Sequence, residues 1–75
     1  MIDTEIDNAI LAVTEPTWRK VAMIIPIAAE QLGINGIDMD SFHEIAKRVE
    51  FLVQTGQLIS QGDIKLWRYS EVKLP

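Results

Sequence analysis

The sequence predicts an α+β fold that is mostly helical, with three helices followed by a C-terminal β-hairpin. Up to about residue 55, apolar residues recur at the spacing that places them on one face of a helix. Prolines and glycines interrupt this pattern where helices are expected to start and stop. Beyond residue 56, two short runs of β-forming residues flank a Gly-Asp pair, which is a hairpin signal.

The first helix is predicted over about residues 4–13. Ile6, Ile10 and Val13 fall on one face of it, and acidic residues crowd its start, where the helix dipole favours anions. Pro16 then interrupts the pattern. It cannot continue a helix, but it suits the opening turn of the next one.

The second helix is predicted over about residues 17–32 and is apolar on nearly every side. Its polar residues are confined to the two ends. A helix of this kind is normally buried on most sides. Met23, Ile24 and Ile27 lie outside its main apolar stripe, so we expect them to supply apolar surface beyond the needs of one small core.

The third helix is predicted over about residues 41–55. Ser41 and Glu44 fit a capping box, in which the serine caps the helix and the glutamate reaches back to it. Gly56 is the expected stop. The predicted buried stripe consists of Phe42, Ile45, Ala46, Val49, Leu52 and Val53.

The hairpin is predicted over about residues 57–61 and 64–69, with Gly62-Asp63 as a two-residue turn. In that register Leu58, Trp67 and Tyr69 share one face, and Ile59, Ile64 and Leu66 share the other. We assign the face with the aromatic residues inward, because aromatic side chains supply the most buried area. A helix that leads into such a hairpin through a glycine is typical of winged-helix domains, so we expect a winged-helix-like fold.

Size and composition exclude several classes of protein. A chain of 75 residues predicts one domain, residues 1–75. The absence of cysteine excludes disulfides and thiolate zinc sites. The apolar run Val21–Ala29 is too short to span a bilayer. The acidic start, Met1-Ile2-Asp3, is unlike a signal peptide, so we expect a cytoplasmic protein.

The residues that could carry chemistry do not form an active-site pattern. His43 is the only histidine, too few for a usual transition-metal site without cysteine. Neither Ser41, Ser60 nor Ser70 lies in a nucleophile motif, and Ser41 is explained as a cap. We therefore expect no enzyme activity, no catalytic residue, no metal and no cofactor.

The first functional hypothesis is a non-enzymatic protein interaction module. Surplus apolar surface on a small domain marks partner sites. The partner is either a second copy, giving a homodimer, or another protein. The predicted partner-binding residues are Ile59, Ile64 and Leu66 of the hairpin with Met23, Ile24 and Ile27 of the second helix.

The alternative is a DNA-binding transcriptional regulator that uses the third helix and the wing. In a helix-turn-helix the exposed face of such a helix enters the major groove. The predicted contacts are His43, Lys47, Gln54, Lys65, Arg68 and Lys73. Charge opposes this reading, because phosphate contacts dominate nucleic-acid affinity. The net charge is −4: residues 1–40 carry seven acids and two bases (−5), and residues 41–75 carry four acids and five bases (+1).

Three segments resemble a bacterial family known only as a domain of unknown function: Trp18-Arg19-Lys20-Val21-Ala22, the junction from Leu52 to Gly56-Gln57-Leu58, and the tail Arg68-Tyr69-Ser70-Glu71-Val72-Lys73-Leu74-Pro75. The resemblance covers about residues 10–75, and the tail is its most distinctive part. In that family the module often lies C-terminal to another uncharacterised domain. The resemblance implies the fold, and it transfers no active-site residues.

Overall fold

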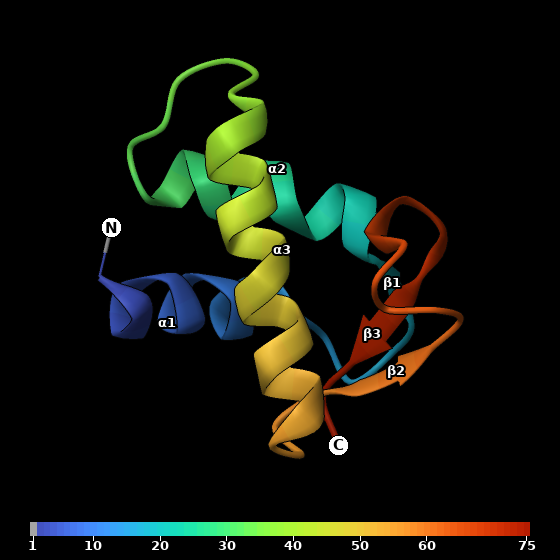
Figure 1. The fold of residues 1–75 in the computed structure, drawn as a ribbon. Helices are drawn as coiled ribbons and strands as arrows, with labels where there is room; N and C mark the ends of the chain where they lie inside the picture. The colour runs from blue at the N-terminus through green and yellow to red at the C-terminus, as the bar shows by residue number, and fades with distance from the viewer. Residues whose placement is uncertain (1) are drawn as a thin grey trace.

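The computed structural model describes residues 2–75 and contains three helices and a three-stranded antiparallel sheet (Figure 1). This confirms the predicted α+β, mostly helical class. The helices are α1 (Asp3–Val13), α2 (Val21–Gln31) and α3 (Met39–Gln54). The strands are β1 (Arg19–Lys20), β2 (Ile59–Gln61) and β3 (Glu71–Lys73), and a 3₁₀ turn, η1 (Trp67–Tyr69), precedes β3.

The core lies where the three helices meet one face of the sheet. Each helix packs against the other two, and α3 crosses in front of α1 and α2 (Figure 1). Burying one such aliphatic side chain stabilises the fold by roughly 1.5–3 kcal/mol. The most deeply buried side chains, each at most 2% exposed, include Ile6, Ile10, Val21, Ile25, Ile45, Val49, Leu52, Leu58 and Val72. Within the described residues, no helix has both the length and the apolar character required to span a membrane.

The second helix is shorter than predicted, because its expected first turn is extended. Arg19 and Lys20 form β1 and pair with β3, and α2 begins only at Val21. The Val21 N–H donates to the carbonyl of Ser70, which ties the start of α2 to the end of the chain. Two residues of strand leave no alternation to detect, so the sequence pattern could not reveal β1.

The third helix begins two residues before the predicted capping box. Asp38 is its N-cap: the carboxylate accepts from the N–H of Ser41 at 3.2 Å and from the Ser41 hydroxyl at 3.1 Å. Ser41 is therefore a donor to the cap and not the cap itself. The predicted stop at Gly56 is confirmed, because Gly56 and Gln57 donate to the carbonyls of Val53 and Leu52 in a Schellman pattern, with φ +80° at the glycine.

The predicted two-residue hairpin is wrong. Strand β2 pairs with β3 and not with residues 64–69, so Ile59, Ser60 and Gln61 face Lys73, Val72 and Glu71. Residues 62–70 form a loop that includes η1. Two local hydrogen bonds turn the chain after Asp63 and prevent it from continuing as a strand. The Asp63 carboxylate accepts from the N–H of Lys65, and the Asp63 carbonyl accepts from the N–H of Leu66.

The loop changes which side chains face the core. Leu58 is buried as predicted, but Tyr69 is 82% exposed and Trp67 is only partly buried. The residue of β3 that faces the core is Val72. The predicted hairpin ended at residue 69 and therefore did not include it. In the predicted patch, Ile64 packs against the core and Ile24 is 2% exposed.

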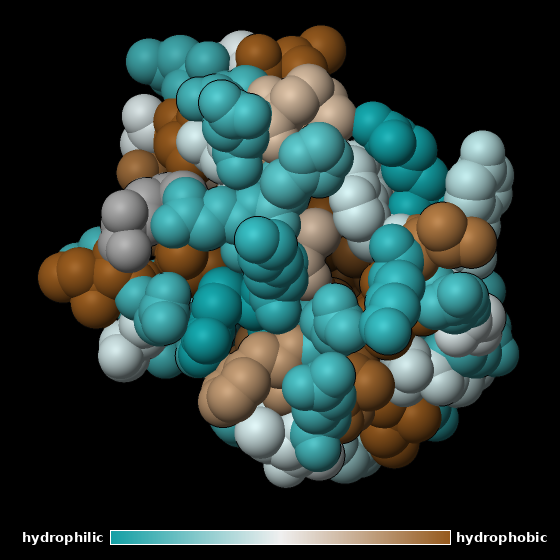
Figure 2. All heavy atoms as spheres, in the orientation of Figure 1, coloured by the Kyte–Doolittle hydropathy of each residue, from teal (hydrophilic) through white to brown (hydrophobic). Residues whose placement is uncertain are grey.

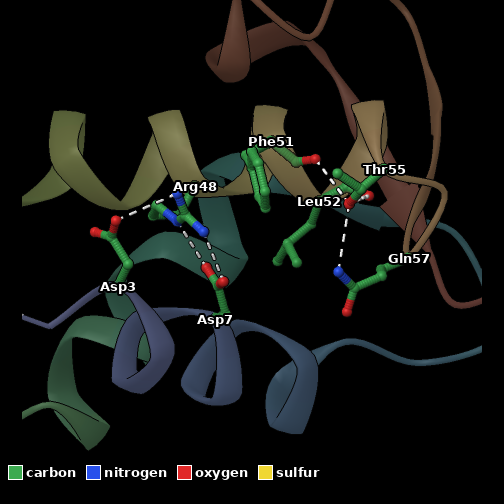
Figure 3. Close-up of polar contacts among 7 residues, drawn as sticks. All are labelled: Asp3, Asp7, Arg48, Phe51, Leu52, Thr55 and Gln57. Carbon is green, nitrogen blue, oxygen red and sulfur yellow. Dashed lines mark hydrogen bonds and ion pairs between the residues drawn. The ribbon is translucent and has the colours of Figure 1, made fainter.

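A bidentate ion pair joins α1 to α3 (Figure 3). The Arg48 guanidinium donates from Nε and from one terminal nitrogen to the two carboxylate oxygens of Asp7, both at 2.8 Å. Asp3 lies 3.4 Å from the other terminal nitrogen, and the guanidinium lies 4.1 Å from the centre of the Phe51 ring. Arg48, which lies outside the predicted buried stripe of this helix, therefore fixes two helices together.

Candidate partner-binding groove

A groove of about 410 Å³ lies between α3 and the loop of residues 62–70. We call it the α3–loop groove. Four residues of α3 line one side (His43, Ala46, Lys47 and Glu50), and residues 64–69 line the other. Figure 2 shows this face, with brown apolar atoms at the bottom of a hollow and teal polar side chains around it. The volume falls in the range of roughly 300–1,000 Å³ that is usual for ligand sites.

The apolar part of the groove comes from both sides. Ala46, Ile64 and Trp67 are partly buried and pack against the core, so their exposed atoms form a fixed surface. Leu66 is 56% exposed. The ring of Trp67 meets the His43 ring edge-on, with centroids 6.3 Å apart. This contact connects the loop to α3.

The charged part of the groove is mostly basic. Lys47, Lys65 and Arg68 line it, against the single acid Glu50, so these four side chains carry +2 in a chain whose net charge is −4. The Arg68 guanidinium lies 4.6 Å from the centre of the Trp67 ring, a cation–π arrangement. Glu50 accepts a long hydrogen bond of 3.5 Å from the Gln54 amide.

The structure brings together part of each predicted site. Of the predicted partner-binding residues, Ile64 and Leu66 line the groove, whereas Met23, Ile27 and Ile59 are exposed elsewhere. Ile24 belongs to the core and offers no surface, which corrects its assignment.

Of the predicted nucleic-acid contacts, His43, Lys47, Lys65 and Arg68 line the groove. Gln54 and Lys73 do not. Lys73 lies on the outer face of the sheet, with its ammonium 5.1 Å from the centre of the Trp18 ring. Trp18 and Ile59 are 38% and 41% exposed there.

Sequence reasoning missed the contribution of Trp67 and Tyr69 to this site, because it placed both side chains in the core. The 3₁₀ turn instead sets Trp67, Arg68 and Tyr69 side by side at the groove. Asp63 is the sequence feature that could have indicated this turn, because its carboxylate favours a local turn over a continued strand.

No metal site is formed within residues 2–75, where no three His, Asp or Glu side chains are grouped closely enough to hold an ion. Comparisons with protein-family models, with curated proteins and with solved structures gave no match. The resemblance of the three segments to a bacterial family therefore stays a prediction.

Proposed function

We propose that the protein is a non-enzymatic protein interaction module that binds a segment of a partner in the α3–loop groove. One observation carries the proposal: η1 presents Trp67, Arg68 and Tyr69 at the edge of a concave, partly apolar surface. Tryptophan, tyrosine and arginine are the residue types most enriched among the side chains that dominate binding energy at interfaces.

Two large apolar side chains at the groove are exposed to solvent, which supports the proposal. Tyr69 and Leu66 are 82% and 56% exposed, although both are large enough to stabilise a core if buried. Binding a partner would remove their apolar area from water, at roughly 25 cal/mol per Å² before the costs of association. A groove with a fixed floor also limits the entropy lost on binding.

The element order supports a winged-helix-like description, which remains part of this proposal. Helix α3 is followed by the antiparallel pair β2–β3, and the long loop between these strands lies beside α3 as a wing would. In this description the groove is the space between the third helix and the wing.

DNA binding is the second candidate, because the groove gathers His43, Lys47, Lys65 and Arg68. The start of α3 opposes it. In helix-turn-helix proteins the N-terminal residues of the recognition helix contact bases. Here Asp38, Asp40 and Glu44 are exposed at that end, where they would repel phosphates.

The test is selection of random displayed peptides on the full chain, followed by NMR of the bound state. Trp67 lines the groove and Trp18 does not, so their two indole N–H signals report on the groove and on a surface outside it. We expect selected peptides to shift the Trp67 signal and leave the Trp18 signal unchanged. Leu66→Ser should weaken binding, and Met23→Ser, which removes an equally exposed apolar side chain from α2, should not.

Two results would contradict the proposal. One is the absence of any selected peptide that shifts Trp67. The other is binding of a pooled duplex DNA library at low salt that falls steeply with added salt and is lost in Lys47→Glu, which would favour the second candidate.

A further inference from the structure

We propose that the occupant of the α3–loop groove is an acidic amphipathic segment of another protein, with apolar anchors flanked by Asp or Glu. This inference rests on the proposed function, and it adds the chemistry of the partner. The argument is charge complementarity around an apolar floor.

The basic side chains of the groove form no ion pair with the described part of the chain. Within residues 2–75, both ion pairs closer than 4.0 Å belong to Arg48, and neither involves Lys47, Lys65 or Arg68. The local excess of positive charge favours an anionic partner, because complementary potentials speed encounter and exclude wrong partners.

Arg68 is the best placed of the three cations. Its guanidinium lies over the face of Trp67, which orients the group beside the apolar floor. A guanidinium held in this way can accept a carboxylate through two parallel hydrogen bonds. An apolar side chain on the floor beside a carboxylate at Arg68 is therefore the expected unit of recognition.

A second copy of the chain is a poorer occupant. In a symmetric dimer the same patch meets itself, so two grooves would bring Lys47, Lys65 and Arg68 against identical cations. A nucleic acid would satisfy the cations, but Asp40 and Glu44 on the exposed start of α3 would oppose its backbone. A short acidic segment confined to the groove brings no second set of cations, and it need not extend over Asp40 and Glu44, which do not line the groove.

The peptide selection described above tests this inference through the composition of the peptides. We expect those that shift the Trp67 indole signal to combine apolar or aromatic residues with an excess of Asp and Glu. Groove-binding peptides that are neutral or basic would overturn the acidic assignment and leave the proposed function standing. If no peptide reaches the groove, both fail.

Charge-reversal variants supply the second readout. Against the tightest acidic peptide, Lys65→Glu with Arg68→Glu should raise Kd by about tenfold or more, because two attractions become repulsions. Arg19→Glu, outside the groove, should change Kd by less than about twofold even though it also adds negative charge. Equal effects of the groove and control variants would overturn the inference. Concentration-dependent dimerisation blocked by the same double variant would also overturn it, in favour of a second copy.

Discussion

Arg48 shows how one side chain on a helix surface can belong to the fold. It reaches across to Asp7 with two hydrogen bonds of 2.8 Å and lies over Phe51 of its own helix (Figure 3). A planar guanidinium can make both contacts at once, which an ammonium group cannot. The residues joined are 41 positions apart, so no local pattern could predict the pair.

We predict that Arg48→Met lowers the melting temperature. Arg48→Lys should have a smaller effect, because it keeps the charge but cannot form the bidentate hydrogen bond to Asp7. A thermal scan with circular dichroism measures both. In a double-mutant cycle with Asp7→Asn, the two changes should be clearly non-additive. Additive changes would show that the pair contributes nothing.

The behaviour of Arg48 at high pH follows from its pKa. The hydrogen bond to Asp7 raises that pKa, against the opposing effect of burial. A raised folded-state pKa gives stability that is fully present below the unfolded-state pKa and is lost only as pH rises through the folded-state value. The contribution of Arg48 should therefore stay constant from neutral pH to about pH 10.

At the scale of elements, the loop of residues 62–70 decides the candidate site. Its direction is set at Gly62, which has φ +80°, and a Cβ there would lie 3.1 Å from the carbonyl oxygen of Tyr69. Gly36, in the connection between α2 and α3, also has positive φ (+71°), but a Cβ there would meet nothing within 4 Å. Substituting Gly36 therefore tests the cost of positive φ alone, whereas substituting Gly62 tests positive φ together with a close contact.

We predict that Gly36→Ala lowers the free energy of unfolding by about 1 kcal/mol, the cost of a side chain at positive φ. Gly62→Ala should lower it by more, because the contact with Tyr69 is added. It should also change the amide signals of residues 64–69, whereas Gly36→Ala should leave them alone. Chemical denaturation and NMR test both statements, and equal destabilisation would contradict the close contact.

At the scale of the whole molecule, the last strand holds the fold together. Strand β3 is the centre of the sheet, between β1 and β2, so it joins residues from the first and last thirds of the chain. Leu74 adds to this by donating to the Glu15 carbonyl at 2.9 Å. Val72 is fully buried, whereas Lys73 lies on the outer face over Trp18.

We predict that Val72→Asp costs more than about 3 kcal/mol, because it buries an unpaired carboxyl group. A domain of 75 residues has only about 4–11 kcal/mol in total, so the variant should be partly unfolded at room temperature. Lys73→Asp, with the same new side chain on the opposite face, should cost less than about 1 kcal/mol. Similar melting curves for the two variants would show that β3 is not central.

The α+β class, the three helices and the buried stripe of α3 could all be predicted from the amino-acid sequence. Those features depend on contacts three or four residues apart and on a local stop at Gly56, and periodicity records such contacts directly. The fully buried positions Ile45, Val49 and Leu52 were all predicted from that period. The net charge of the chain likewise follows from its composition alone.

The sheet and the groove depend on contacts between residues far apart in the sequence, which the local pattern does not contain. Strand β1 has two residues, and its partner in β3 lies more than fifty positions away, so pairing with distant chain and not local propensity makes it a strand. The local turn at Asp63 redirected residues 64–69, which moved Trp67, Arg68 and Tyr69 from a predicted strand to the edge of a groove beside α3. Which apolar residues remain exposed depends on long-range packing, and a one-dimensional pattern does not contain that information.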